Sequence, residues 1–493
     1  MMTDHLFAAA DLGATSGRVI LGRLSNGLFS LEDIHRFPTP SYREAGHLHW
    51  DAVTLVKQII HGLRLAASDG HLDGVGVDTW GVDYGRLDSA GALLEEPFHY
   101  RDSRTNGVPE SFFASFAPQD FYAEAGLQVL EFNTIFQFVS SGGDPGWKDT
   151  RTCLFLPDLF AYWLCGAKNA ELTVASTSGL LDVEKRDWSP VILDHLRDHL
   201  GLDLCGTLPP IVEPGTVVGE VRPEFLPSPT PFVAVASHDT ASAIVSVPAS
   251  TSSFAYISSG TWSLVGLELD HPILTEESRL ADFTNELGVD GTVRYLRNVM
   301  GLWVLSESQR CWDEQGLESN LLELLHVAGN LSALTTVVDM EDPRLIAPGD
   351  MPARLSQMAR ETGQPVPQTP AEFTRCILDS LALDYRRVIR RAMELSNSDV
   401  EVVHIVGGGC RNRLLNQLTA EATGLTVISG PAEGTALGNL LIQARAVGAV
   451  SGDLADLRKI CRDSCEVTVY SPGEMRISSA DWDQAERRAF GTM

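Results

Sequence analysis

Two stretches far apart in the chain follow the same pattern. FAAADLGATSGRVILG (residues 7–22) and FAYISSGTWSLVG (residues 254–266) each run from an apolar segment through a turn of small residues into a second apolar segment. The first turn residue stands at the same distance from the phenylalanine in both, at Asp11 and at Ser258. Apolar runs on either side of a short turn predict β-hairpins. The repeat therefore predicts that two halves of the chain open with the same hairpin.

The rest of the chain alternates between helical and extended patterns. Residues 51–67 carry apolar side chains at helical spacing, with Asp51 placed to cap the helix, and GVGVDTW (74–80) reads as a buried strand. At 493 residues the chain is too long for one ordinary core. We expect an α/β protein of two domains, residues 1–246 and 247–493, with a ligand-binding cleft between them. Residues 320–370 are richer in proline and polar residues, and we expect them to wrap the surface.

Charge and cysteine content limit the possible partners and compartment. The 37 Lys and Arg residues against 65 Asp and Glu residues give a net charge of −28, which argues against a nucleic acid or an anionic membrane as main partner. The first apolar run ends at Asp11, and no run approaches the ~18 apolar residues of a membrane helix. Eight cysteines are scattered along the chain, as is usual in a reducing cytosol. We expect a cytoplasmic monomer or small homo-oligomer that acts on a small molecule.

The first turn, DLGATSGR (residues 11–18), allows two interpretations. It lacks the spacing of a Walker A loop, and a strand follows it where a dinucleotide-binding fingerprint needs a helix. It is either an ordinary hairpin turn or a phosphate site. In the second case, backbone N–H groups, the hydroxyls of Thr15 and Ser16 and the charge of Arg18 would hold phosphate oxygens. Asp11 could then hold Mg²⁺ through water.

The stretch PFVAVASHDTASAI (residues 231–244) places an acidic residue between a strand and a helix. Asp239 could cap the helix, or it could act as a base at the carboxyl end of a strand, where open α/β sheets place their chemistry. The same carboxylate could also do both. In phosphoryl transfer to a hydroxyl, an aspartate orients the alcohol and accepts its proton.

Two further turns carry small residues. SSGTWS (residues 258–263) matches the first turn, and Thr261 could offer its hydroxyl to a phosphate. GGGCRN (residues 407–412) lies between a β-branched strand and a helix, where a nucleotide could approach the backbone. Close packing of the helix on the strand is the alternative explanation for these glycines.

GVDTWGVDYG (residues 76–85) contains two carboxylates that we do not expect to act as a pair. Asp78 and Asp83 point to opposite faces if the strand is extended. Gly81, next to Trp80, suggests the close approach of a polar ligand. Downstream, the arginines of FHYRDSRTN (residues 98–106) are expected to tie loops together.

Taken together, these motifs resemble the FGGY carbohydrate kinases. The family's motifs appear in order between residues 11 and 439, as DLGATSGR, GVDTWGVDYG, YRDSRTN, ASHDTASA, SSGTWS, RNVMGLW, HIVGGGCRNRLLNQL and GTALGN. The residues in these motifs are most similar to those of family members that phosphorylate L-rhamnulose. The resemblance implies two domains of the actin-like ATPase (ribonuclease H-like) fold. It places sugar and phosphate binding in residues 1–246 and nucleotide binding in residues 247–493.

The resemblance also implies an activity, its cofactors and its site. The activity is phosphorylation of O1 of L-rhamnulose in L-rhamnose catabolism, with ATP and Mg²⁺ as cofactors and Asp239 as proton acceptor. Asp11 would organise Mg²⁺. The implied ATP contacts are Ala14, Thr15, Ser16, Gly17, Arg18, Thr261 and Gly408, and the implied ketose contacts are Gly81, His238, Thr240 and Asn298.

The chain departs from the family pattern at some positions. Ser306 stands where the L-rhamnulose subgroup has a glutamine that contacts ATP, and Thr419 and Thr423 replace a cysteine pair. Asp158 replaces a lysine of the wider family, as in the subgroup. Two alternatives remain open. One is a kinase of another ketose, such as L-fuculose or L-xylulose. The other is a sugar-sensing regulator or filament-forming ATPase, which the acidic composition and the retained Asp239 disfavour.

Overall fold

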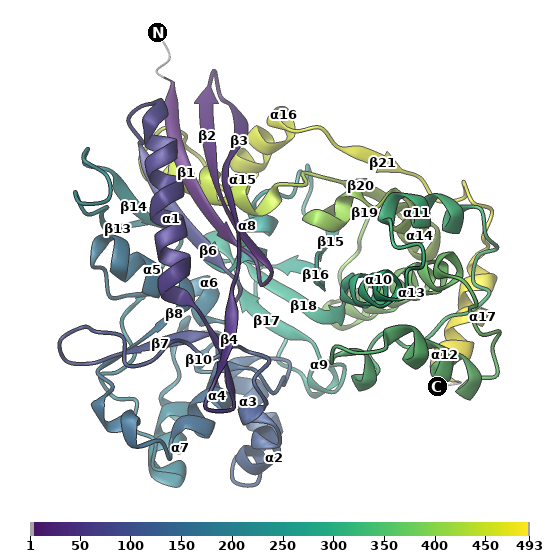
Figure 1. Ribbon diagram of the computed structural model, residues 1–493, viewed down its shortest axis with the longest axis horizontal. Helices are drawn as coiled ribbons and strands as arrows, with labels where there is room; N and C mark the ends of the chain where they lie inside the picture. The colour runs from purple at the N-terminus through teal and green to yellow at the C-terminus, as the bar shows by residue number, and fades with distance from the viewer. Residues whose placement is uncertain (1–3, 492–493) are drawn as a thin grey trace. The chain divides into compact units, whose positions relative to one another are not determined.

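The computed structural model describes residues 4–491, which form two compact units (Figure 1). Unit 1 contains the residues up to Ser250 together with Leu269–Tyr295 and Gly434–Cys465. Unit 2 contains Thr251–Glu268, Leu296–Glu433 and the residues from Glu466 onward. From the sequence we expected two contiguous domains, residues 1–246 and 247–493. That division stays a prediction. The compact units are not contiguous in sequence, because two later segments pack with unit 1.

Unit 1 is built on a six-stranded mixed sheet with the strand order β13-β14-β6-β1-β2-β3 (Figure 1). β1 is antiparallel to β2 and parallel to β6, and β14 is parallel to β6. The first predicted hairpin is therefore confirmed. The strands are β1 (His5–Leu12), β2 (Ser16–Ser25), β3 (Leu28–Pro38), β6 (Gly74–Thr79), β13 (Thr216–Glu220) and β14 (Pro231–Ala234).

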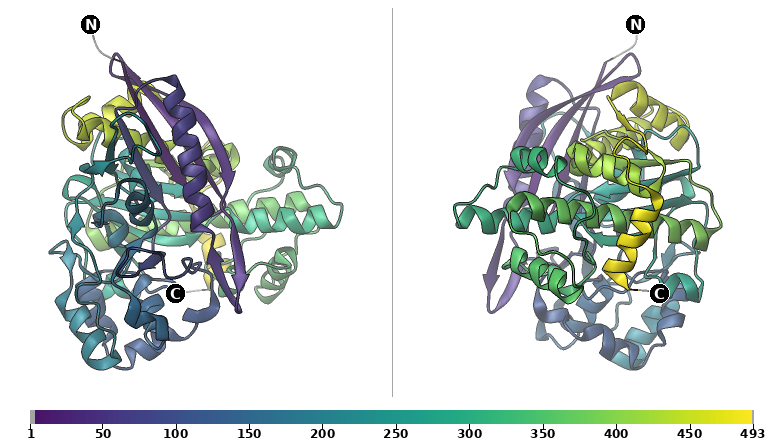
Figure 2. Two further views of the ribbon diagram at one scale, coloured as in Figure 1. Left: turned by 60° about the vertical axis from the view of Figure 1, so that its left-hand side comes forward. Right: turned by 90° about the vertical axis from the view of Figure 1, so that its right-hand side faces the viewer.

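Alternate residues of β1 pack into different cores. Ala8 and Ala10 pack with helices α1 and α5, whereas Phe7 and Ala9 pack with α8 and α15. Since side chains alternate along a strand, Asp11 shares the face that α8 and α15 cover. Figure 2 (left) shows α1 lying along the strands β1 to β3. The four helices are α1 (Ala52–Ala66), α5 (Leu156–Cys165), α8 (Asp239–Val245) and α15 (Gly434–Ala446).

Helix α1 begins and ends where its sequence predicts. The carboxylate of Asp51 accepts the backbone N–H of Thr54 at 2.9 Å, which satisfies one of the free donors of the first turn. The buried side chains of α1 follow its helical period and face the sheet. Local capping and periodicity are therefore sufficient to define this element.

The second sheet repeats the central arrangement of the first. Its strands run in the order β17-β18-β16-β15-β19-β20-β21. β15 is antiparallel to β16 and parallel to β19, just as β1 is to β2 and β6. The duplicated hairpin is confirmed, and so is the expected α/β class. The strands are β15 (Phe254–Ser259), β16 (Trp262–Leu269), β17 (Thr284–Leu287), β18 (Val293–Met300), β19 (Val402–Val406), β20 (Thr426–Ser429) and β21 (Thr468–Tyr470).

The remaining elements complete each unit. Those of unit 1 include β4 (Ser41–Glu44), β5 (His47–Trp50), β7 (Tyr84–Leu87), α2 (Val108–Phe113), α3 (Pro118–Ala125), α4 (Thr134–Ser141), β8 (Thr152–Phe155), β9 (Ala170–Glu171), α6 (Leu172–Ala175), β10 (Leu181–Asp182), β11 (Asp187–Trp188), α7 (Pro190–Leu200), β12 (Ile211–Val212), α9 (Glu276–Leu280) and α16 (Leu454–Ser464). Those of unit 2 include α10 (Trp303–Glu314), α11 (Leu321–Gly329), α12 (Met351–Glu361), α13 (Pro370–Ser396), α14 (Arg413–Thr423) and α17 (Ser479–Phe490).

Residues 320–370 do not simply wrap the surface as expected. They contain α11 and α12, and Val337, Met340 and Leu355 are fully buried. Among residues 4–491, no helix combines the length and the apolar composition that crossing a membrane requires.

Close packing between α8 and α15 generates a stability prediction. A Cβ atom added to Gly438 would overlap the carbonyl oxygen of Ser242 in α8, and a backbone atom cannot move aside as a side chain can. We expect Gly438→Ala to lower the free energy of unfolding by about 1–3 kcal/mol. The measurement is urea unfolding followed by tryptophan fluorescence.

The matched control is Gly329→Ala in α11, where an added Cβ atom would meet none of the described residues within 4 Å. This substitution should leave stability unchanged or raise it by up to about 1 kcal/mol, because alanine favours a helix over glycine. Equal unfolding midpoints for the two variants would contradict the predicted packing.

Candidate active site

The parallel strands of unit 1 bring carboxylates to one edge of its sheet. Asp11 near the end of β1 and Asp78 near the end of β6 are register partners. The chain that leaves β14 runs beside β6, since Ser237 O accepts the Thr79 N–H at 2.9 Å. Asp239 follows two residues later as the first residue of α8. The structure therefore gathers three carboxylates at the carboxyl ends of parallel strands, where α/β sheets place their sites.

These three carboxylates differ in their access to solvent. The side chain of Asp239 is 29% exposed and that of Asp11 is 10% exposed, whereas Asp78 is fully buried. Only an accessible carboxylate can receive a proton directly from a bound substrate. Asp239 is the most accessible of the three.

Asp239 lies in the first turn of α8, where its carboxylate is bonded to Thr240. Its Oδ1 accepts the backbone N–H of Thr240 at 2.5 Å and the Thr240 hydroxyl at 3.1 Å. The N-cap position itself is taken by His238, which makes no side-chain capping bond. Burial raises the pKa of Asp239, although the nearby His238 opposes this effect. A raised pKa makes this carboxylate a stronger base than an ordinary aspartate.

A buried glutamate holds the loop in front of Asp239. Glu171 Oε2 accepts the Ser237 N–H at 3.0 Å, and the Thr173 hydroxyl, itself bonded to Glu171, accepts the His238 N–H at 3.2 Å. Burial raises the pKa of Glu171 to about 7. Sequence reasoning missed this residue, because an isolated glutamate in an apolar stretch matches no motif.

Asp78 is held by a helix that comes late in the chain. Its Oδ2 accepts the amide of Asn439 at 2.6 Å, and Gln443 donates to the Asn439 side-chain oxygen at 2.6 Å. The other oxygen of Asp78 has no hydrogen-bond partner among residues 4–491. Burial, reinforced by the nearby Asp11 and Asp239, raises the pKa of Asp78 well above its ordinary range. The motif GTALGN marked this helix in the sequence without indicating its role.

Asp11 and Arg18 face each other across the first hairpin. They are register partners, and Arg18 donates to Asp11 Oδ2 through Nη2 at 2.7 Å and Nε at 3.0 Å. The two groups therefore neutralise each other instead of standing apart at the two ends of the turn. Between them, Thr15 and Ser16 are exposed. Gly17 is buried, and a Cβ atom there would overlap the Phe37 ring.

Asp83 lies in a different environment from Asp78, as expected, but for another reason: β6 ends at Thr79, and Asp83 lies in the turn before β7. Its Oδ2 accepts the indole N–H groups of Trp50 at 2.6 Å and Trp80 at 2.9 Å. A Cβ atom on Gly81 would lie 2.7 Å from the Thr177 hydroxyl, so packing alone already requires a glycine there. The guanidinium of Arg104 bonds to the carbonyl and side chain of Gln137 and ties a loop to α4, in agreement with the expected structural role.

The other candidate residues lie in unit 2. Thr261 is in the turn between β15 and β16, and its carbonyl accepts the Trp303 N–H at the start of α10. Asn298 lies on β18. Gly408 is exposed with open space at its Cα, whereas a Cβ atom on Gly409 would overlap Ser259. Packing therefore requires a glycine at 409, and Gly408 leaves a stretch of backbone accessible to a ligand.

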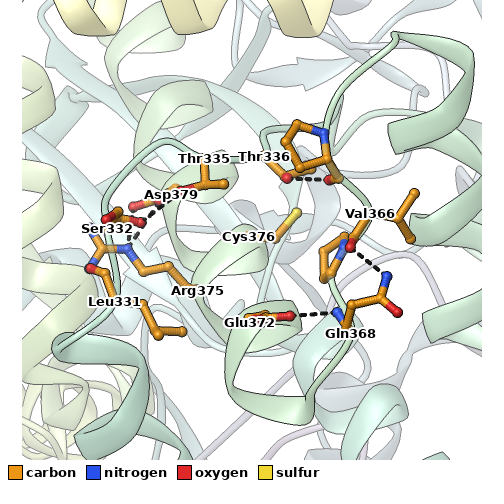
Figure 3. Close-up of a pocket in the computed structure, with 12 residues that line it drawn as sticks. Leu331, Ser332, Thr335, Thr336, Val366, Gln368, Glu372, Arg375, Cys376 and Asp379 are labelled. Carbon is orange, nitrogen blue, oxygen red and sulfur yellow. Dashed lines mark hydrogen bonds and ion pairs between the residues drawn. The ribbon is translucent and has the colours of Figure 1, made fainter.

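A cavity of about 300 Å³ in unit 2 is a separate feature (Figure 3). None of the site residues expected from the sequence is among the twelve that line it. Most of its polar groups bond to one another, including Arg375 to Asp379 at 3.0 Å and the Gln368 N–H to Glu372 at 2.6 Å. The cavity therefore does not belong to the candidate site.

Both halves of the chain match one enzyme family. The description "FGGY family of carbohydrate kinases, N-terminal domain" matches residues 6–246, and the corresponding C-terminal domain matches residues 255–447. Among solved structures, gluconate kinase from Lactobacillus acidophilus is similar with a TM-score of 0.79 and 17% identity over 98% of this chain and 96% of that one. Plasmodium falciparum glycerol kinase with ADP is similar with a TM-score of 0.77 and 14% identity over 99% of each chain. These likenesses confirm the expected fold.

Two curated relatives extend the comparison. The rhamnulokinase of Bacteroides thetaiotaomicron is 39% identical over 490 residues, which cover 97% of each chain. The rhamnulokinase of Enterococcus faecalis is 38% identical over 473 residues, which cover 94% of each chain. With both domains matched and near-complete coverage of these relatives, the chain belongs to the FGGY family of carbohydrate kinases.

Proposed function

We propose that this kinase transfers the γ-phosphoryl group of ATP to O1 of L-rhamnulose and so serves L-rhamnose catabolism. The similarity to rhamnulokinases over nearly the whole chain supports this choice of substrate. The observation that carries the chemistry is the position of Asp239, an accessible carboxylate of raised pKa at the carboxyl edge of the unit 1 sheet. The protein would act in the cytoplasm, as a monomer or small homo-oligomer. Its eight free cysteines agree with a reducing compartment.

Asp239 is the proton acceptor in this proposal. A carboxylate in contact with the sugar hydroxyl orients it and takes its proton as the new P–O bond forms. The Thr240 N–H and hydroxyl fix the carboxylate at Oδ1 and leave Oδ2 for the substrate. Asp78 is fully buried and cannot replace it.

The first turn of unit 1 is proposed to bind the ATP phosphates through Ala14–Arg18. The exposed hydroxyls of Thr15 and Ser16 and the charge of Arg18 suit phosphate oxygens. Arg18 would exchange its contact with Asp11 for a phosphate, which would free Asp11 for the metal.

The carboxylate of Asp11, beside this turn, fits a magnesium ion that is bound together with a nucleotide. In residues 4–491, no three His, Cys, Asp or Glu side chains are grouped so that they could hold a metal by themselves. Mg²⁺ normally takes one or two carboxylates, with substrate phosphates and water as the other ligands. Asp11 is the proposed carboxylate. The ion would neutralise charge on the phosphates when bound.

Unit 2 is proposed to supply further nucleotide contacts through Thr261 and Gly408. The open backbone at Gly408 supports this role. Gly81, His238, Thr240 and Asn298 are the proposed ketose contacts. Ser306 follows the first turn of α10, but its side chain is shorter than the glutamine of the subgroup, and we assign it no contact with ATP.

The role of Asp239 gives a kinetic prediction. Asp239→Asn keeps the size and one acceptor oxygen but cannot take a proton, so kcat should fall by ~10²–10⁴-fold while ketose binding changes little. Steady-state kinetics and ketose titration of the purified variant measure the two quantities. The matched control is Asp453→Asn, which alters a carboxylate that caps α16 and should leave kcat unchanged. A near-normal kcat in Asp239→Asn would contradict the role of Asp239 as proton acceptor.

The proposed substrate gives a second prediction. In a coupled ADP-release assay, kcat/KM for L-rhamnulose should exceed that for L-fuculose and L-xylulose by roughly tenfold or more, since a pocket discriminates by its contacts with each hydroxyl. A higher value for either other ketose would reassign the substrate within the family. No turnover of any ketose would favour the regulator alternative.

A further inference from the structure

His238 has an almost fully buried ring with charged neighbours on both sides. Its Nε2 lies 3.5 Å from Asp239 Oδ1. Its Nδ1 lies 3.1 Å from Arg294 Nη1 and 3.2 Å from Glu286 Oε2. Arg294 and Glu286 come from β18 and β17, and no motif in the sequence singled them out.

Arg294 and Glu286 form a buried ion pair that is fixed in place. Their side chains are 1% and 7% exposed, with Nη1 and Oε2 at 2.9 Å. Two other guanidinium nitrogens of Arg294, Nε and Nη2, bond to the carbonyl of Leu287 at 3.3 and 3.2 Å. Burial would raise the pKa of Glu286, but the Arg294 charge and the neighbouring His238 together outweigh this effect and lower it. Glu286 is therefore a carboxylate, and the pair as a whole is neutral.

Of the two groups beside Nδ1 of His238, only Arg294 has hydrogen-bond geometry. Glu286 Oε2 lies 3.2 Å from Nδ1, but the angles of that contact do not meet the geometry of a hydrogen bond. A guanidinium can only donate hydrogen bonds. A hydrogen bond from Arg294 to Nδ1 needs a lone pair on that nitrogen, which in a singly protonated ring leaves the proton on Nε2.

We propose that Arg294 is a positioning residue that fixes His238 as a hydrogen-bond donor through Nε2–H, with Glu286 as the counter-ion that lets a charged arginine remain buried. The donor points toward Asp239 and toward the space where the proposed sugar binds. The contact between His238 and the sugar rests on the proposed function. The position of the proton on the ring rests only on the side chains of His238, Arg294 and Glu286.

This arrangement assigns different tasks to two adjacent residues. With its proton on Nε2, His238 has no free lone pair on the side of the substrate, so it cannot compete with Asp239 for the hydroxyl proton. It can only donate to a sugar oxygen or to the Asp239 carboxylate. An acceptor oxygen of the ketose at this point would satisfy the Nε2–H donor, whereas a ligand with only a C–H group there would leave this donor only the Asp239 carboxylate.

The direct test is ¹⁵N NMR of the full-length protein labelled at histidine, with the His238 signals identified by their loss in His238→Gln. The two nitrogens of a neutral imidazole have well-separated shifts that report which one carries the proton. We expect the Nε2–H form in the unliganded wild-type protein. The Nδ1–H form would overturn the proposal without any variant having to fold.

Two variants separate positioning from simple support of the fold. Arg294→Met removes the donor and leaves Glu286 as an acceptor beside Nδ1, so the proton should move to Nδ1. Glu286→Gln leaves the Arg294 donor in place, so the Nε2–H form should persist even if stability falls. A purely structural role would give the two variants the same tautomer.

Kinetics give a second readout. Arg294→Met should raise the KM for the ketose by roughly tenfold, the value of one hydrogen bond, with little change in the KM for ATP. The control is Arg375→Met, which breaks a buried arginine–aspartate pair in unit 2 and should leave the His238 tautomer unaltered. An unchanged tautomer in Arg294→Met would overturn the proposal. The NMR result is independent of the substrate, so an inactive sugar panel with the expected tautomer would count against the proposed function alone.

Discussion

The parallel pairing of β1, β6 and β14 is the constraint on which the site of unit 1 depends. Parallel strands end at the same edge of a sheet, so residues that are far apart in sequence meet there. The register sets Asp11 opposite Asp78, and the continuation of β14 brings Asp239 to the same edge. The antiparallel hairpin then returns Arg18 to Asp11. No loop has to be long or flexible for these groups to assemble.

Behind this edge lies a layer of buried polar side chains, each in contact with groups from another part of the chain. Glu171 holds the loop before His238, Asn439 holds Asp78, and the Arg294–Glu286 pair holds the His238 ring. A buried charge without a partner is costly, so such groups are kept only where their partners are fixed. The layer keeps the accessible carboxylate in one position, as a reactive group that must meet a substrate requires.

The sequence predicted those helices and hairpins that residues close together in the chain are enough to indicate. Helix α1 has its cap and its period, the two hairpins have matching turns, and the glycines before α14 lie directly after a strand. It also brought Asp239 to attention, because that residue stands between a strand and a helix. It did not predict Glu171, Glu286 or Arg294, since their partners are distant in sequence and an isolated charged residue has no pattern. For residues 320–370, the content of proline and polar residues led us to expect a surface segment, and the buried faces of α11 and α12 were not predicted.

The late helix α15 has a consequence for how the protein is made. Its buried apolar residues complete the core on one face of β1, and its Asn439 partners Asp78. A ribosome that has finished residues 1–250 has therefore released a sheet with one face covered only in part, by α8, and with Asp78 still without its Asn439 partner. Unit 1 can close only after the segment ending at Cys465 has emerged, when nearly the whole chain has been translated. During most of its synthesis, this chain must keep an unfinished apolar surface from aggregating.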